Sequence, residues 1–236
     1  MRFSKRIYAL RDAVSKGESV ADIGTDHGYV PMLLVRDGIS PYVVMSDISE
    51  DSLSKAVETF SAVGITADES QFRVGDGIAT IEAGEVDDII IAGLGGYTIR
   101  NILSENIDKT RSYKKLILQP RKYSGSLRYW LHHNGFRIIR EDLSSEGKFV
   151  CEIITAVPDF DFEVSAADYP EDDIRWAYPE SLKTCDKELL TKRVGWKLGS
   201  IKEQLDNLAK SGKEHDELEN RLNSDYEYLS SLIENE

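Results

Sequence analysis

The sequence has little cysteine and no long apolar run. Only Cys151 and Cys185 occur among 236 residues. They stand at no metal-ligand spacing and are too few for a disulfide framework. No run approaches the roughly 18 apolar residues of a transmembrane helix, and the apolar stretch at residues 7–10 is too short for a signal peptide. We therefore expect a reducing, cytoplasmic protein with no metal site and no membrane contact.

The net charge of −13 argues against a protein that coats nucleic acid without selectivity. Positive charge is nevertheless concentrated in two places, near the N-terminus and in a region without acidic residues. These clusters are Arg2, Lys5, Arg6, Arg11 and Lys16, and then Lys109, Arg111, Lys114, Lys115, Arg121, Lys122 and Arg128. A basic face that contacts phosphates and ordinary solvated surface charge both fit this pattern.

Short apolar runs alternate with helical patterns through about residue 134. The predicted strands are 18–23, 42–46, 71–74, 87–92 and 115–119. The predicted helices are 3–16, 29–36, 49–62, the segment that follows Gly96 through about Leu103, and 124–134. Such alternation is typical of a parallel sheet with helices on both faces. Two further strands, 136–143 and 148–157, are separated by only four residues, which predicts an antiparallel hairpin.

The composition changes after this hairpin. Residues 158–179 are rich in acids, aromatic residues and proline, which predicts a linker or packed extended segment. Apolar residues then recur three and four apart in two stripes, with a break at residues 211–213. The stripes are Val194, Leu198, Ile201, Leu205 and Leu208, followed by Leu218, Leu222, Tyr226, Leu229 and Ile233. We predict an antiparallel coiled-coil hairpin with Trp196 near its base, hence two parts, 1–157 and 158–236, in a monomer.

Three acids follow successive predicted strands: Asp22, Asp47 and Asp76. The carboxyl ends of parallel strands form the crevice where open α/β sheets bind ligands. Asp47 suits the hydroxyls of a ribose, and Asp76 suits the amino group of an adenine. The Gly24 turn and Asp22 suit the carboxylate and ammonium of a methionine moiety. Each acid alone would fit a helix cap or solvated turn better, but three at matching positions favour a nucleoside cofactor.

The turn at residues 24–28 narrows the choice of cofactor. It lacks the G-x-G-x-x-G pattern, and its neighbouring acid would repel a pyrophosphate, which argues against NAD and FAD. The absence of a P-loop lysine argues against ATP hydrolysis. S-adenosylmethionine has no phosphate and carries a positive sulfonium, so it is compatible with neighbouring carboxylates.

Several motifs, in order, resemble those of the bacterial tRNA (adenine-N1)-methyltransferases of the TrmK type, which modify adenine 22. These motifs are residues 22–31, 46–47, 75–77, 91–96 and 119–120. Gly28 and Leu94 stand where the family commonly has alanine and methionine. The resemblance implies a class I S-adenosylmethionine-dependent methyltransferase fold, α/β and Rossmann-like, with a seven-stranded sheet whose last strand is antiparallel, followed by the helical hairpin.

The resemblance also implies site residues. Those that enclose the cofactor are Asp22, Gly24, Thr25, Asp47, Ile48, Asp76, Gly77, Ala92, Gly93, Leu94, Gly95 and Gly96. The target adenine would enter beside the catalytic candidates Asp26, His27 and Tyr29. Adenine N1 is unprotonated at neutral pH and can attack the methyl directly, so alignment supplies much of the acceleration. Asp26 would stabilise the developing positive charge, while His27 has either a catalytic or a structural role.

The base must leave any pairing to react, and Tyr29 or Tyr97 is a candidate to stack on it. The two basic clusters would contact tRNA phosphates. The hairpin would grip tRNA by shape or dock a partner, with its contacts near the base rather than at the acidic tip. The basic residues near its base are Lys183, Lys187, Lys192, Arg193, Lys197 and Lys202. The alternatives are a class I methyltransferase with another RNA or other substrate, and a non-catalytic nucleoside-binding adaptor.

Overall fold

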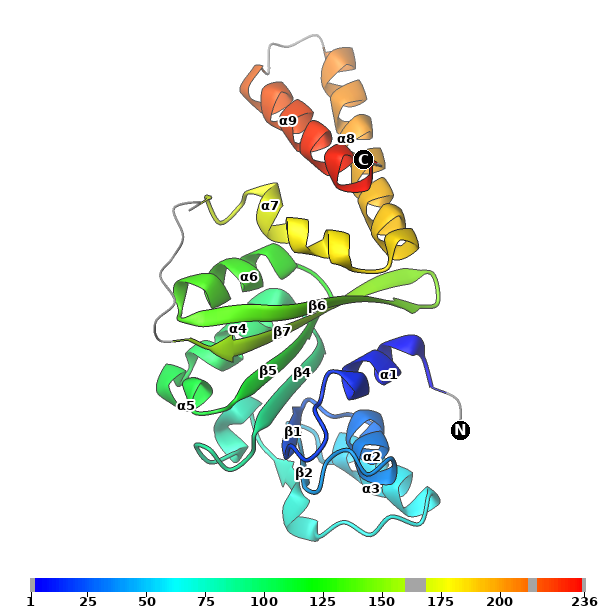
Figure 1. Cartoon of the computed structure of the whole chain (residues 1–236), viewed down its shortest axis with the longest axis vertical. Helices are drawn as coiled ribbons and strands as arrows, with labels where there is room; N and C mark the ends of the chain where they lie inside the picture. The colour runs from blue at the N-terminus through cyan, green and yellow to red at the C-terminus, as the bar shows by residue number, and fades with distance from the viewer. Residues whose placement is uncertain (1–2, 160–168, 212–215, 235–236) are drawn as a thin grey trace.

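The computed structural model describes residues 3–159, 169–211 and 216–234, and it shows a sheet flanked by helices with a helical hairpin at one end (Figure 1). The strands are β1 (Val20–Ile23), β2 (Val43–Asp47), β3 (Phe72–Val74), β4 (Asp88–Leu94), β5 (Lys115–Pro120), β6 (Phe136–Glu146) and β7 (Phe149–Pro158). The helices are α1 (Lys5–Asp12), α2 (Tyr29–Arg36), α3 (Glu50–Ala62), α4 (Gly96–Ser104), α5 (Ile107–Arg111), α6 (Ser124–His133), α7 (Ile174–Ala177), α8 (Lys187–Ser211) and α9 (Asp216–Ile233). Short 3₁₀ helices are η1 (Glu69–Gln71), η2 (Gly77–Thr80) and η3 (Glu180–Thr184).

The seven strands form one sheet in the order β3-β2-β1-β4-β5-β7-β6. Strands β1 to β5 pair in parallel, whereas β7 lies antiparallel between β5 and β6. The predicted class I methyltransferase fold is thereby confirmed. The order reverses between β1 and β4, because the chain first builds outward through β2 and β3. Ligand crevices of open α/β sheets form at such a switch point, outside the carboxyl ends of the strands.

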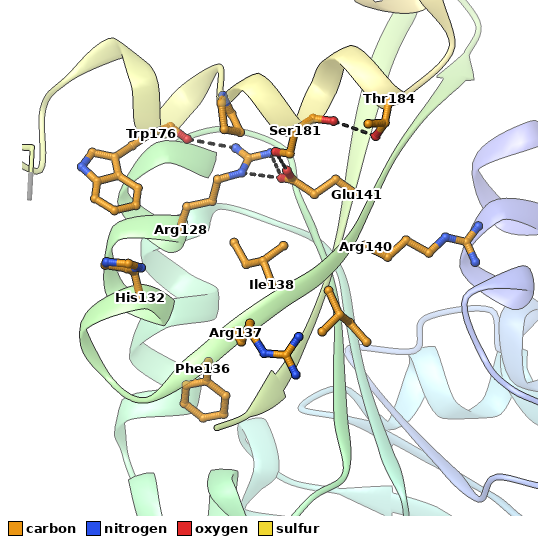
Figure 2. A pocket seen from close by; sticks show the side chains of 12 residues that line it. Arg128, His132, Phe136, Arg137, Ile138, Arg140, Glu141, Trp176, Ser181 and Thr184 are labelled. Carbon is orange, nitrogen blue, oxygen red and sulfur yellow. Dashed lines mark hydrogen bonds and ion pairs between the residues drawn. The ribbon is translucent and has the colours of Figure 1, made fainter. Parts of the chain in front are cut away.

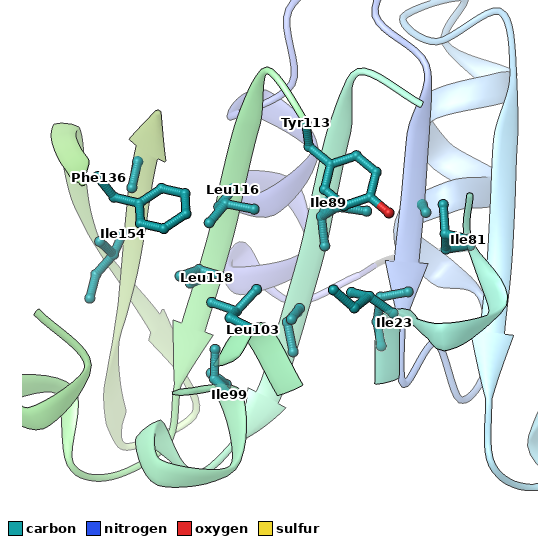
Figure 3. Packing of buried hydrophobic residues seen from close by; sticks show 14 of the residues in the cluster. Ile23, Ile81, Ile89, Ile99, Leu103, Tyr113, Leu116, Leu118, Phe136 and Ile154 are labelled. Carbon is teal, nitrogen blue, oxygen red and sulfur yellow. The ribbon is translucent and has the colours of Figure 1, made fainter. Parts of the chain in front are cut away.

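The central strands are buried on both faces, which explains their nearly continuous apolar sequence. In β4, Ile89 and Ile91 point into one core layer and Ile90 into the other. Figure 3 shows the first layer, where Ile89 and Leu116 pack with Tyr113. Because both layers are full, the carboxyl edge is where these strands offer functional groups to a ligand.

The structure corrects two details of the sequence prediction in the terminal sheet hairpin and the segment after it. The loop expected at residues 144–147 is mostly strand, because the pairing of β6 with β7 continues to Glu146, opposite Phe149. Gly147 then turns with φ +59°. The expected linker contains α7 in its described part, and η3 follows directly, so this segment is packed rather than extended. Residues 160–168 lie outside the described residues.

Helices α8 and α9 pack together as the predicted hairpin. The first stripe is confirmed, with Val194 and Ile201 fully buried. The second stripe is partly wrong, because Leu218 and Tyr226 are exposed while Leu232 is buried. The buried face of α9 follows residues 222, 229 and 232, and this turns the other two toward solvent. The predicted break lies largely outside the described residues, and the division at residue 157 stays a prediction.

Candidate functional site

The turn after β1 is held against its neighbours by the backbone. Gly24 adopts φ +72°, and its amide donates a hydrogen bond to the carbonyl of Ser46 at 2.8 Å. The Thr25 amide donates to the same oxygen at 3.1 Å. Gly28, with φ +64°, precedes α2, and a Cβ there would lie 2.8 Å from the Cβ of Ala56. The loop therefore needs glycine at Gly28 both for its backbone conformation and for close contact with α3.

A cavity of about 280 Å³ opens at the carboxyl end of β1. Nine of the predicted site residues line it: Asp22, Gly24, Thr25, Asp26, His27, Tyr29, Ala92, Gly93 and Leu94. They come from the end of β1, the turn after it and the start of α2, and from the end of β4; β1 and β4 are the two strands at the switch point. The sheet topology thus brings two sequence motifs about 70 residues apart into one cavity.

Asp22 is the buried acid of this cavity. Its side chain accepts a hydrogen bond from the Thr25 hydroxyl at 2.8 Å, and the residue is only 6% exposed. Burial raises the pKa of Asp22 to about 7, against the lowering effects of the Thr25 hydroxyl and the Arg6 charge. A cationic ligand group in the cavity would favour the ionised carboxylate, so Asp22 is suited to bind one.

Asp47 and Asp76 lie farther along the same edge of the sheet. The Asp47 carboxylate accepts hydrogen bonds from the backbone amides of Asp26 (3.2 Å) and Ser49 (3.0 Å). The backbone carbonyl of Asp47 accepts from the Gly75 amide at 3.0 Å, which joins the loops after β2 and β3. Asp76 is exposed, and its side chain makes no capping bond to η2. Both acids lie at the carboxyl edge of the sheet but do not line the cavity.

The remaining predicted cofactor residues also lie outside the cavity lining. Ile48 is 72% exposed beside Asp47. Gly77 packs against α4, since a Cβ there would lie 3.0 Å from Ile102. Gly95 and Gly96 form the start of α4, directly after the β4 strand end that lines the cavity.

The three predicted catalytic residues all line the cavity. Asp26 has φ +48°, and its exposed carboxylate lies 3.6 Å from Lys55 Nζ and 3.8 Å from His27 Nε2. The rings of His27 and Tyr29 are stacked, with centroids 5.1 Å apart and planes within 4°. The Phe3 ring contacts Tyr29 at a centroid distance of 5.1 Å. Asp26 is thus accessible, whereas the Tyr29 ring is already packed.

Two arginines that line the cavity were not assigned to it from the sequence. Arg6 reaches it from α1 and donates hydrogen bonds to the side chains of Gln119 (3.2 Å) and Glu146 (2.9 Å). Arg121 reaches it from the end of β5. Both belong to the basic clusters, but no sequence signal separates a cation that points into a cavity from one on the surface.

The prediction that the whole 109–128 cluster faces phosphates is wrong for its buried members. Lys115 is buried, with its Nζ 2.5 Å from Glu18 and 3.1 Å from Asp88. Arg128 is 1% exposed and lies within a buried ion-pair network. Arg121 and Lys122 remain exposed beside the cavity. These basic side chains lie in the core because acidic partners are buried with them.

Within the described ranges, no group of three or more His, Cys, Asp or Glu side chains is arranged to hold a metal ion. No helix of the same ranges is both long enough and apolar enough to cross a membrane.

The family model for a methyltransferase domain matches residues 3–154, from the start of the described chain into β7. The chain belongs to this family. Its relatives include the tRNA (adenine(22)-N(1))-methyltransferase of Bacillus subtilis, 31% identical over 156 residues, which are 66% of this chain and 65% of that enzyme. The chain thus matches slightly less than two thirds of that relative's length.

A solved structure extends the similarity to the helical hairpin. It is described as a "putative tRNA (m1A22) methyltransferase" of Streptococcus pneumoniae in complex with S-adenosyl-L-methionine. The two chains are 26% identical, with a TM-score of 0.80, over 99% of this chain and 100% of the other. These matches confirm the resemblance predicted from the motifs.

Proposed function

We propose that this protein transfers a methyl group from S-adenosylmethionine to N1 of adenine 22 in tRNA. The observation that carries the proposal is the buried Asp22 carboxyl in a cavity at the switch point of the sheet, within a chain that matches a methyltransferase family. The similarity to the B. subtilis and S. pneumoniae proteins supports the choice of tRNA and of this nucleotide.

The residues present fit this cofactor. The Asp22 carboxylate is suited to the ammonium of its methionine part, and a Cβ at Gly24 would meet nothing within 4 Å, which leaves space for a ligand. Asp47, with Ile48 beside it, is proposed to hold the ribose, and Asp76 and Gly77 the adenine. The loop from Ala92 to Gly96 is proposed to close the site from β4. When bound, the cofactor supplies an electrophilic methyl on a sulfonium.

The protein's part in the reaction is to align the acceptor and to stabilise charge. N1 of the adenine attacks through its lone pair, so no base is needed to remove a proton first. The product is cationic, and the Asp26 carboxylate beside the cavity favours it electrostatically. His27 lies in stacking contact with Tyr29, and this supports a role for it in holding the loop.

We further propose that the enzyme acts as a monomer in the cytoplasm, where its tRNA substrate is found. The apolar seam between α8 and α9 is closed within one chain, which supports the monomer. Arg121 and Lys122 are candidates for phosphate contacts because they are exposed at the cavity's edge.

The test is methyl transfer from labelled S-adenosylmethionine to unmodified tRNA, followed by nucleoside mass spectrometry and mapping of the modified position. We expect 1-methyladenosine at position 22. Transfer to a different nucleotide or substrate would favour another class I methyltransferase. Cofactor binding without transfer to any RNA would favour the adaptor.

Asp26→Asn sharpens the test, since asparagine keeps the shape and tolerates the left-handed backbone. We expect transfer to fall at least tenfold while the melting temperature stays unchanged, because the Asp26 side chain is 59% exposed. Asp172→Asn, at a similarly exposed carboxylate outside the cavity lining, is the matched control and should leave transfer unchanged.

A further inference from the structure

Two tyrosines stand exposed beside the cavity. Tyr97 is 44% exposed in the first turn of α4, and Tyr123 is 60% exposed directly before α6. Their ring centroids lie 4.7 Å apart with the planes tilted by 41°. Single exposed aromatic rings are ordinary, but a pair that forms one surface indicates a contact with another molecule.

The backbone fixes this pair at the rim of the cavity. The Arg121 amide donates to the Leu94 carbonyl at 2.8 Å, and the Gly96 amide donates to the Lys122 carbonyl at 2.8 Å. Leu94 and Arg121 both line the cavity. A Cβ on Gly96 would lie 2.2 Å from the Tyr123 carbonyl oxygen, so glycine is required for this close approach. The loops after β4 and β5 therefore present the two rings together.

The backbone of Tyr123 is strained, with φ +59° and ψ 37°. Among the residues that the structure describes, only Asp26 and Tyr123 combine a positive φ with a side chain. Both border the same cavity, Asp26 as part of its lining and Tyr123 two residues after Arg121. Strained backbone of this kind persists mainly where function requires the side chain.

We propose that Tyr97 and Tyr123 form a stacking platform for an unpaired base of the RNA substrate. The inference rests on the proposed function and deepens it. The Arg100 guanidinium lies 5.2 Å from the Tyr97 ring centroid, whereas the Tyr123 ring is the more exposed of the two. The exposed cations Arg121 and Lys122 directly precede Tyr123 and suit the adjoining phosphates.

This platform is better suited to a base than the other tyrosine at the cavity. Tyr29 is stacked on His27 and contacts Phe3, so its ring is already engaged within the protein. Stacking on an aromatic ring tolerates any base, and specificity for adenine then comes from the cavity.

The decisive variant is Tyr123→Gly. Glycine adopts φ +59° without strain, so the melting temperature should stay level or rise, while the stacking surface is lost. We expect tRNA affinity and kcat/KM for tRNA to fall about tenfold to a hundredfold, as for other base-stacking residues. The Kd for S-adenosylmethionine, measured by calorimetry, should be unchanged. Tyr123→Phe should stay within about twofold of the wild type, because it keeps the ring.

Tyr226→Ala is the matched control, since Tyr226 is a 38% exposed aromatic residue on the acidic helix α9. It should leave tRNA affinity unchanged. Wild-type tRNA affinity in Tyr123→Gly, or a parallel loss of cofactor affinity, would overturn the platform. If the wild type transfers no methyl group to tRNA, the proposed function fails. The ratio of the tRNA affinities of Tyr123→Gly and the wild type still tests the platform in that case.

Discussion

Two cavities of this molecule each border a buried ionisable side chain, Asp22 in one and Arg128 in the other. The second cavity, of about 340 Å³, lies between β6 and the segment of α7 and η3 (Figure 2). Arg128 donates hydrogen bonds to Glu141 and Glu152, both at 2.7 Å, and to the Trp176 carbonyl at 3.2 Å.

The two charges differ in their compensation. Arg193 lies 2.6 Å from Glu152, so the Arg128 cavity is bordered by a network of two cations and two anions. Among the residues that the structure describes, Asp22 has only the Thr25 hydroxyl as a direct hydrogen-bond partner. The larger cavity therefore borders charges that hold β6, β7, α6 and α8 together, while the smaller one offers a charge to a ligand. Compensation of the buried charge, rather than cavity size, distinguishes the candidate site.

Breaking the compensated network should have the largest effect on stability. Glu152→Gln leaves the buried Arg128 and the partly buried Arg193 with one anion fewer, and we expect the free energy of unfolding to fall by about 3–5 kcal/mol. Urea denaturation measures this change. Affinity of the folded fraction for S-adenosylmethionine should be unchanged. A stability loss below about 1 kcal/mol would show that the network resembles an exposed pair, and Asp172→Asn provides that reference.

Replacing Asp22, the acid without an ionic partner among the described residues, should change stability in the opposite direction. Asp22→Asn is expected to weaken S-adenosylmethionine binding about tenfold to a hundredfold, since a charge-assisted hydrogen bond is lost. The ligand-free protein should become more stable by up to about 4 kcal/mol at pH 8, because ionisation of a buried carboxyl no longer costs free energy. Calorimetry and urea denaturation at pH 8 measure the two effects. A destabilised variant would contradict this account of Asp22.

The pH dependence of stability gives a further test of Asp22. The pKa of Asp22 is raised by burial from 3.8 to about 7. Between these values the native state keeps a proton that the unfolded state has lost, so this group's contribution to stability falls as pH rises from about 4 to 7. Burial raises the pKa of Asp88 to about 7 as well, so the difference between wild type and Asp22→Asn isolates Asp22.

Affinity for S-adenosylmethionine should rise with pH, whereas the contribution of Asp22 to stability falls. It should rise with pH up to about 7 in the wild type, because a bound ammonium favours the ionised Asp22, and Asp22→Asn should lack this rise. Titration calorimetry from pH 5 to 8 measures it. An equal pH slope in both proteins would assign the effect to another group.

The smallest effect on stability should come from a substitution at Gly24, in the loop after β1. At Gly24, a Cβ meets nothing within 4 Å, so Gly24→Ala costs only the left-handed backbone, about 1–2 kcal/mol. Thermal unfolding measures this loss. Gly147→Ala, at φ +59° and likewise with open space, is the matched control for the backbone cost. Only the Gly24 variant should also weaken cofactor binding, because its methyl enters the cavity side of the loop.

Much of the site could be predicted because its residues lie at or just after the carboxyl ends of strands. Apolar runs located β1 and β4, and the residues just after such strands share one edge whatever the details of packing. Asp22 was found in this way, whereas Asp26 and Gly93 were implied by the resemblance to a known family, and all three line one cavity. Arg6 was not found, because its position depends on how α1 packs across the sheet toward Gln119.

The sequence by itself determined the alternation of strands and helices, the terminal hairpin of the sheet and the glycine turn after β1, since these depend on local periodicity and backbone freedom. Tertiary structure decided which charges are compensated. The sequence analysis interpreted Lys115 and Arg128 as surface cations. They lie in the core because they pair with the buried acids beside them. Charge compensation acts between side chains distant along the chain, so it cannot be predicted from composition or spacing.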